Sequence, residues 1–486
     1  MPHPPLWLDA DTPELRAGLA RIREEFEVPG AHSPAAVDEA DVVSRAVLRS
    51  LDGALGGARR DARHLELVTI DPPGSRDLDQ ALHIAARAGG WRVSYAIADV
   101  PAFVDPGGAV AAEVQDRGVT FYLPDHRSPL HPPRIGEDAG SLLPGQERPA
   151  VLWQIDLDGD GQVVGADLRR AVVRSRAQLT YAEVQAEVDS GRAGGTLAAL
   201  AEVGQRRLAL EAARDGVSLD LPSQRVVVDD GGRLRLEHEP LVASMGWNAQ
   251  ISLLTGMVAA EAMLTGGVGL LRTLPPPDED VERKVRRTAK GLGLDWPEDA
   301  SYQSLVRELD GSDPDEAAVL MVAARGLRGA GYLPILPGEA LPADPAAVGH
   351  AAVAAPYAHV TAPLRRLCDR AAIEVCLALY AGQAVPDHVL ELLPELPRAM
   401  ARATAREGGA AKAVVDLVEA LLLQPLIGEV VEATVVSSGP ERSAVVLGEL
   451  AVETVVEGVE LPLSEVVPLR IESVDVAART VLLAPA

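Results

Sequence analysis

Three aspartates stand close together in residues 69–80, whose sequence is TIDPPGSRDLDQ. Asp71 ends a stretch that alternates like a β-strand, and the residues Pro-Pro-Gly-Ser that follow are typical of a turn. Asp77 and Asp79 are two positions apart, so in an extended chain their side chains point to the same side. Converging carboxylates repel one another unless a cation lies between them, and oxygen ligands suit Mg²⁺ or Mn²⁺. The spacing predicts a metal site with room for water and phosphate, and an acidic surface turn is the alternative that it leaves open.

Two adjacent arginines, Arg365 and Arg366, stand near the start of an amphipathic stretch. Thr361 suits a helix N-cap and Pro363 a first turn, so the pattern predicts a helix over residues 363–381. A helix dipole disfavours cations in the first turn by roughly 0.3–1 kcal/mol each, but backbone N–H groups and guanidinium groups together suit an anion. The segment predicts an anion site, and a solvated arginine pair bonded to nearby carboxylates is the alternative.

A second group of aspartates imitates a calcium-binding loop. Asp156, Asp158, Asp160 and Gly161 have the spacing of such a loop, and Asp167 stands eleven residues after the first. The flanking residues alternate like strands rather than helices, and the last ligand is Asp instead of Glu. The sequence therefore predicts a hairpin turn at this position and not a calcium site.

The elements that must position these residues change in character along the chain. Apolar residues at helical spacing predict a small helical module in residues 1–62, which is either of helix-turn-helix type or a packing arm on the next domain. Residues 63–422 predict a large mixed α/β domain. Its expected strands lie at 65–71 and 91–100, its hairpin within 147–175, and its long helices at 199–214, 247–265, 280–292, 314–329 and 363–381. Residues 423–486 predict a small barrel of short Val-rich strands, which makes the whole an α+β multidomain protein.

The composition is that of a globular protein with a net charge of −26. That charge argues against nucleic acid as a partner on average, but a local channel lined with arginine can still focus an anionic substrate. No long apolar run and no signal-like start is present, so we expect no membrane partner and a cytoplasmic location. Cys368 and Cys376 are expected to be two buried thiols on one helix.

Seven segments, in order, resemble the ribonuclease II (RNB) family of processive 3′→5′ exoribonucleases. They are TIDPPGSRDLDQ (69–80), IADVPAFV (97–104), RGVTFYLPDHRSPLHPP (117–133), GSLLPGQER (140–148), AQLTYAEV (177–184), SLDLP (218–222) and YAHVTAPLRRLCD (357–369). The resemblance implies an RNB-type mixed α/β catalytic domain, and in residues 423–486 an S1-like OB barrel. It also implies single-stranded RNA with a free 3′ end as the partner of a monomeric enzyme that releases nucleoside 5′-monophosphates.

The resemblance also implies roles for individual residues. Asp71, Asp77 and Asp79 would hold Mg²⁺, or Mn²⁺, at the scissile phosphate in a two-metal arrangement, and Arg365 would steady the transition state together with Asp79 as the catalytic residues. The residues implied to contact RNA are Arg366 on a neighbouring phosphate, Tyr181 stacked on the terminal base, Tyr122 as a clamp near the channel mouth, Asn248 or Gln250 on the terminal nucleotide, Tyr357 and Thr361.

Several positions depart from the family pattern. The fourth acidic residue of the cluster is Gln80, a neutral ligand that supplies less charge and can favour Mn²⁺. Ala362 replaces a serine and Leu367 an aromatic residue. Two other functions therefore stay open: an RNA-binding protein on a weakened nuclease scaffold, which Gln80 favours, and a metal phosphohydrolase acting on small nucleotides, which has no need of a terminal RNA-binding barrel.

Overall fold

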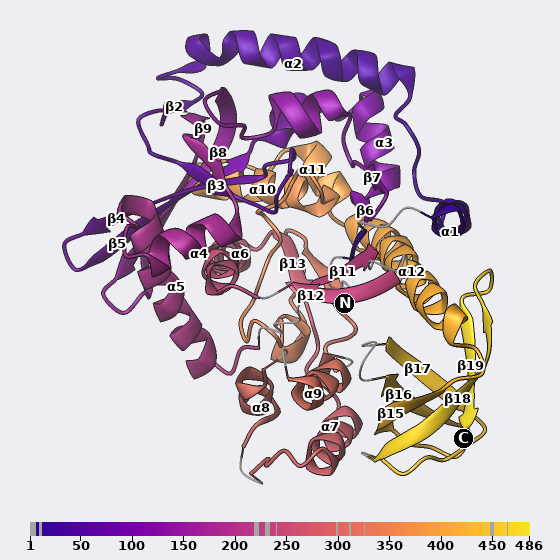
Figure 1. Cartoon of the computed structure of the whole chain (residues 1–486). Helices are drawn as coiled ribbons and strands as arrows, with labels where there is room; N and C mark the ends of the chain where they lie inside the picture. The colour runs from indigo at the N-terminus through magenta and orange to yellow at the C-terminus, as the bar shows by residue number, and fades with distance from the viewer. Residues whose placement is uncertain are drawn as a thin grey trace.

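The structure is a computed structural model of the chain, drawn in Figure 1. It describes residues 6–8, 12–217, 223–228, 234–239, 241–297, 300–310, 313–324, 326–447, 452–463 and 465–486. The segment SLDLP (218–222) lies outside the described residues. Within the described ranges, no helix combines the length and the apolar character that crossing a bilayer requires.

A seven-stranded sheet with the order β10-β3-β4-β5-β8-β9-β2 forms the centre of the molecule. Its inner strands are antiparallel, whereas the two outermost pairs, β10–β3 and β2–β9, are parallel. The strands are β2 (Arg60–Asp61), β3 (Val68–Ile70), β4 (Gln80–Arg87), β5 (Gly90–Ala98), β8 (Glu147–Asp158), β9 (Val163–Arg174) and β10 (Ala177–Leu179). The central strands β5 and β8 are buried along most of their length because helices cover the sheet.

Helices from distant parts of the chain pack on this sheet. Three helices contact its strands: α2 (Pro34–Ala54), α5 (Gly195–Ala213) and α10 (Leu367–Ala381). A second set packs against these helices: α3 (Ala109–Arg117), α4 (Tyr181–Asp189) and α6 (Ala243–Gly266). α5 and α6 approach closely, since a Cβ on Gly204 would lie only 2.5 Å from the Cβ of Trp247. The predicted helices at 199–214 and 247–265 are confirmed as α5 and α6, and both cysteines lie buried and free on α10 as predicted.

The amino-terminal helices do not pack as a pair. α1 (Pro13–Glu25) inserts Leu15, Leu19 and Ile22 against the long helix α12 (Leu396–Leu423), whereas α2 runs across α3 and the sheet (Figure 1). β1 (Leu6–Leu8) pairs with β11 (Ser223–Val228), which pairs with β12 (Leu234–Glu239). The helices expected in residues 1–62 are thus present, and the boundary of a module at residue 62 stays a prediction.

The last strands form a separate small sheet. Its order is β17-β16-β15-β18-β19, with β15 (Val430–Ser437), β16 (Arg442–Leu447), β17 (Val452–Glu457), β18 (Val466–Asp475) and β19 (Thr480–Pro485). The edge strands β17 and β19 contact each other, so the sheet closes almost completely into the predicted barrel beside the end of α12 (Figure 1). Val435, Val445 and Leu469 fill its interior.

Short elements complete the architecture. They are the hairpin of β6 (Phe121–Leu123) and β7 (His126–Ser128), the pair β13 (Gly269–Thr273) and β14 (Gly331–Ile335), and the helices α7 (Glu279–Gly291), α8 (Tyr302–Glu308), α9 (Pro314–Ala324) and α11 (Asp387–Leu392). The aspartates at 156–160 lie at the β8–β9 hairpin as predicted: Asp158 accepts from the N–H groups of Asp160 and Gln162, and Arg92 binds Asp156.

The helix predicted to start at residue 363 begins instead at Leu367, and Arg366 is its N-cap. The expected N-cap, Thr361, lies five residues earlier in a non-helical segment. Two carboxylates bind backbone N–H groups of this non-helical segment: Asp369 accepts from Ala362 and Asp79 accepts from Leu364. Tertiary hydrogen bonds therefore override the local capping pattern.

Candidate active site

Strand ends position two of the three aspartates. Asp71 directly follows β3, and its backbone N–H donates to the carbonyl of Leu179 in β10 at 3.0 Å. Asp79 directly precedes β4, and its carbonyl accepts from Ala98 at 2.9 Å. Between Asp77 and Asp79, Leu78 is fully buried, so the chain alternates and the two carboxylates lie opposite to it.

A hairpin from outside the sheet holds Asp77. Tyr122 of β6 donates its hydroxyl to one oxygen of Asp77 at 2.6 Å, and Arg127 of β7 binds the other oxygen at 2.6 Å. Arg127 also forms an ion pair with Glu137. Tyr122 remains 45% exposed, which leaves its ring accessible to a ligand. The sequence predicted Tyr122 but missed Arg127, although Arg127 lies within the same motif.

The segment at residues 361–366 closes the pocket from the other side. Asp79 Oδ1 accepts from the Leu364 N–H at 2.7 Å, and Arg365 Nε lies 3.8 Å from Asp79 Oδ2. Gln80 donates its amide to the carbonyl of Thr361. The Arg365 side chain is 48% exposed, whereas Asp79 is buried. Residues almost 300 positions apart thus meet around one carboxylate, and Arg365 keeps a half-exposed guanidinium beside it.

Arg366 has a different environment from its neighbour. Its Nε and Nη2 each lie 2.8 Å from an oxygen of Asp369, a bidentate ion pair with a fully buried carboxylate. The same carboxylate holds the N–H of Ala362. Arg366 therefore braces the loop that carries Arg365, and its role as a phosphate contact stays a prediction. Asp369, which lies in the motif YAHVTAPLRRLCD, was not singled out from the sequence.

The electrostatics of the pocket favour a bound cation. Burial raises the pKa of Asp71 to about 6, and the charge of Asp77 adds to this shift. Burial also raises the pKa of Asp79 well above its usual range, against the opposing influence of Arg365 and the Leu364 N–H. Asp71 Oδ2 is buried without a hydrogen-bond partner among the described residues. Carboxylate and amide oxygens are the donor type that Mg²⁺ or Mn²⁺ takes, so Asp71, Asp77 and Asp79 with Gln80 would hold such an ion. In this structure the oxygens of the three aspartates do not all lie within 4.8 Å of one another.

The remaining predicted residues divide into two groups. Tyr181, at the start of α4, lies close enough to Asp71 and Arg365 to feel their charges, and its hydroxyl bonds to Asn248 of α6. Tyr357 is buried beside His350 and His359, against the backbone of Gly256. Tyr181 therefore lies near the acidic pocket, and the RNA contacts expected of Tyr181, Asn248 and Tyr357 stay predictions.

Gln250 does not join the acidic pocket. Its side chain is buried, and its amide donates to Glu211 of α5, so it faces the neighbouring helix. The expectation that Gln250 contacts the terminal nucleotide stays a prediction, and in this structure its amide is engaged by Glu211. A helical repeat of 3.6 residues explains the difference, because Asn248 and Gln250, two positions apart, point in directions about 200° apart.

Comparison with protein families identifies two regions of the chain. Residues 59–376 match the RNB domain, and residues 429–486 match the RNase II-type exonuclease C-terminal S1 domain. The first match alone covers well over half of the chain. Both regions agree with the central sheet and the terminal barrel seen in the structure.

Individual proteins give the same picture. The chain is 31% identical over 336 residues to the exosome complex exonuclease RRP44 homolog A of Arabidopsis thaliana, an alignment that covers 64% of this chain and 34% of that relative. This chain therefore spans about a third of the length of that curated relative. Mycoplasma genitalium RNase R in complex with ribose methylated single-stranded RNA has a similar fold, with a TM-score of 0.82 at 16% identity over 98% of this chain and 79% of that one. Yeast Ssd1, a pseudonuclease, has a TM-score of 0.66 at 17% identity over 84% of this chain and 51% of that one.

Proposed function

The chain belongs to the RNB family, and on that premise we propose that it is a hydrolytic, processive 3′→5′ exoribonuclease. It degrades single-stranded RNA to nucleoside 5′-monophosphates and depends on a divalent metal. The observation that carries this proposal is the meeting of Arg365 with Asp79, at 3.8 Å, in a pocket that also contains Asp71 and Asp77. The half-exposed guanidinium of Arg365 beside the buried carboxylate of Asp79 supports a catalytic role over a purely structural one.

Each side chain has a task in this reaction. Asp71, Asp77 and Asp79 hold the metal, which when bound lowers the pKa of water and neutralises charge on phosphate oxygens. Arg365 donates hydrogen bonds to the phosphate as negative charge develops on it in the transition state. Arg366 and Asp369 keep Arg365 in place, because their ion pair fixes the loop before α10. Tyr122 and Arg127 orient Asp77 so that its charge is directed into the pocket.

RNA is held by aromatic and polar contacts around this centre. Tyr181 and Tyr122 offer ring faces on which bases stack, at roughly 1–3 kcal/mol per base for any sequence. Asn248 bonds to Tyr181 and limits its rotation. The S1 barrel binds RNA outside the catalytic domain. Thr361 and Tyr357 contact the RNA within that domain. The cytoplasmic location and the monomeric state also remain our predictions.

A second function is favoured by one specific feature. Gln80 occupies the position of the family's fourth acidic residue and donates its amide to Thr361. The fold resemblance to Ssd1 shows that this architecture also occurs in a pseudonuclease. An RNA-binding protein with weak or no cleavage is therefore the alternative that an experiment must exclude.

One assay separates these functions. A 5′-labelled single-stranded RNA is incubated with the protein and Mg²⁺ or Mn²⁺, and the products are resolved by length. The proposal expects stepwise shortening from the 3′ end, release of nucleoside 5′-monophosphates and no reaction in chelator. Binding without shortening identifies the RNA-binding alternative. Hydrolysis of mononucleotides without cleavage of RNA identifies a small-nucleotide phosphohydrolase.

A further inference from the structure

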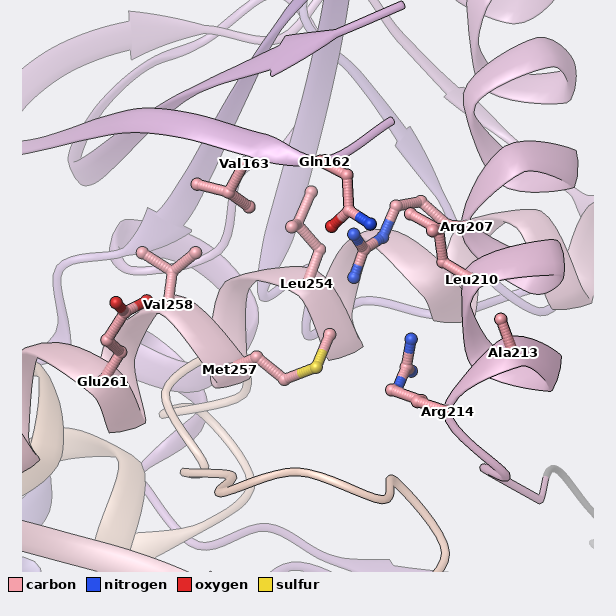
Figure 2. Close-up of a pocket in the computed structure, with 10 residues that line it drawn as sticks. All are labelled: Gln162, Val163, Arg207, Leu210, Ala213, Arg214, Leu254, Met257, Val258 and Glu261. Atoms are coloured by element: carbon pink, nitrogen blue, oxygen red, sulfur yellow. The ribbon is translucent and has the colours of Figure 1, made fainter. Parts of the chain in front are cut away.

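A cavity of about 530 Å³ lies between α5, α6 and the turn that joins β8 to β9 (Figure 2). Leu254, Met257 and Val258 of α6 form its apolar wall, and Arg207 of α5 and Arg214, the C-cap of that helix, enter it from the other side. Its size is in the range of small-molecule sites, which are largely apolar with a few converging polar groups. None of the residues that line it belongs to the acidic pocket.

The two arginines carry buried N–H groups that lack acceptors. Arg207 is only 4% exposed, and its Nη1 donates to the carbonyl of Gly161 at 3.1 Å. Arg214 donates Nε to the carbonyl of Val353 at 2.8 Å. Arg207 Nε and Arg214 Nη2 are buried without a hydrogen-bond partner in the part of the chain that the structure describes. Leaving a buried charged donor unsatisfied is costly, so these N–H groups favour a ligand that brings acceptor oxygens into the cavity.

The charged groups around the cavity also favour an anionic ligand. Burial and the neighbouring charge of Arg214 lower the pKa of Arg207 to about 10, which shows that the two guanidinium groups repel each other. Glu211 lies between them in sequence and favours the charged form of both. Glu261 is exposed at the opposite end of the cavity, where solvent screens it. The inner end of the cavity is therefore the electropositive one.

We propose that this cavity binds a small phosphomonoester. The phosphate group of a monoester has three terminal oxygens and up to two negative charges, so it can accept from Arg207 and Arg214 at once. The apolar wall formed by Leu254, Met257 and Val258 receives the organic part of the ligand. A nucleoside 5′-monophosphate combines both features, and only that choice rests on the proposed function, since it is the product of the proposed reaction. Inorganic phosphate supplies the same chemistry without the organic part.

Binding is tested by isothermal titration calorimetry on the full chain in metal-free buffer with chelator. The probes are adenosine 5′-monophosphate, inorganic phosphate and adenosine, so the assay does not depend on nuclease activity. We expect both phosphates to bind and adenosine alone not to bind. Tighter binding of the nucleotide than of phosphate supports a ligand with an organic part, and equal binding supports recognition of phosphate alone.

Variants locate the ligand. Arg214→Gln, at a half-buried position, is expected to weaken binding about tenfold or more, as is Arg207→Gln. Arg206→Gln removes the same charge from the same helix outside the cavity and is expected to leave the affinity within about twofold. Unfolding midpoints without ligand show whether each variant is folded. If Arg207→Gln does not fold, the test is made with Arg214→Gln alone.

Two results would overturn the proposal. The first is that neither adenosine 5′-monophosphate nor inorganic phosphate, at millimolar concentration, gives a heat of binding with the wild-type protein. The second is binding that survives in Arg214→Gln and Arg207→Gln but is lost in Arg365→Gln, because the ligand would then lie in the acidic pocket. Neither result contradicts the nuclease function, which the cleavage assay tests by itself.

Discussion

The acidic pocket and the cavity between α5 and α6 are opposite in charge but alike in construction. In the pocket, buried carboxylates gather and Asp71 Oδ2 lacks a partner among the described residues. In the cavity, Arg207 and Arg214 repel each other and each retains an N–H group without an acceptor within the described chain. Protein interiors rarely leave buried charged groups with polar atoms that make no hydrogen bond. Both regions therefore indicate a ligand of the opposite charge, and the following variants test how far this likeness extends.

Loss of Arg365 is expected to have the largest effect on turnover. Arg365→Gln removes the half-exposed guanidinium beside Asp79, and we expect kcat on single-stranded RNA to fall about 100- to 1000-fold with KM little changed. Steady-state kinetics on a short labelled RNA measures both constants. The control is Arg76→Gln, which removes an exposed arginine near the same aspartates and should keep kcat within about twofold. If kcat fell equally in the two variants, Arg365 would contribute only its general positive charge and not a specific contact with the phosphate.

Protonation of Asp71 at low pH should stabilise the metal-free protein against unfolding. Because the pKa of Asp71 rises from its usual range to about 6 on folding, its contribution to stability is full below about pH 4 and is lost as the pH rises to 6. The free energy of unfolding of the wild type, minus that of Asp71→Asn, should fall by at most about 3 kcal/mol across this window. Denaturant titrations of dialysed protein at several pH values measure it. Added Mn²⁺ should oppose the trend above pH 6, and a flat difference without metal would contradict it.

Restoring charge at Gln80 tests whether the pocket is short of negative charge. Gln80→Glu has nearly the same shape but replaces the amide that donates to Thr361 with a carboxylate. We expect the half-saturating Mg²⁺ concentration for cleavage to fall about tenfold. Gln178→Glu is a matched control, because Gln178 also donates its amide to a backbone carbonyl, that of Ser75 at 2.8 Å, outside the carboxylate cluster. An equal change in both variants would mean that general charge, and not ligation, sets the metal requirement.

The hydroxyl of Tyr122 should have the smallest effect. Tyr122→Phe removes the hydrogen bond to Asp77 and keeps the ring, so we expect the metal requirement to rise about two- to tenfold with RNA affinity unchanged. Tyr122→Ala also removes the stacking surface and should weaken RNA binding by roughly 1–3 kcal/mol. Fluorescence anisotropy with labelled RNA separates the two variants. Identical RNA affinities in both would show that the ring does not contact RNA.

The sequence predicted the acidic pocket better than the loop that closes it. Alternation around Leu78 and the turn after Asp71 depend on local chain geometry, so spacing alone was informative there. The start of α10 was placed four residues too early, because Asp79 and Asp369 capture backbone N–H groups that a local pattern cannot reveal. Arg127 was missed for a similar reason, since its partner Asp77 lies 50 residues away.

The cavity between α5 and α6 left no comparable signal in the sequence. Arg207 and Arg214 are seven residues apart, a spacing that is ordinary for the solvated face of a helix. Only the packing of α6 and of the β8–β9 turn over that face buries them. The contact of Gln250 with Glu211 of α5 could not be predicted either, because apolar residues surround α6 and its sequence gives no direction. Which polar side chains are buried therefore depends on tertiary packing and could not be predicted from the local sequence.

The most direct test of the catalytic pocket is the Asp79→Asn variant with RNA binding and cleavage measured on the same sample. The substitution keeps the shape of a side chain that accepts from Leu364 and faces Arg365, but it removes the charge needed for a metal. We predict release of nucleoside 5′-monophosphates at least about 1000-fold slower than in the wild type, with the RNA dissociation constant within about twofold. Cleavage by Asp79→Asn at the wild-type rate would contradict the assignment of this pocket as the catalytic centre.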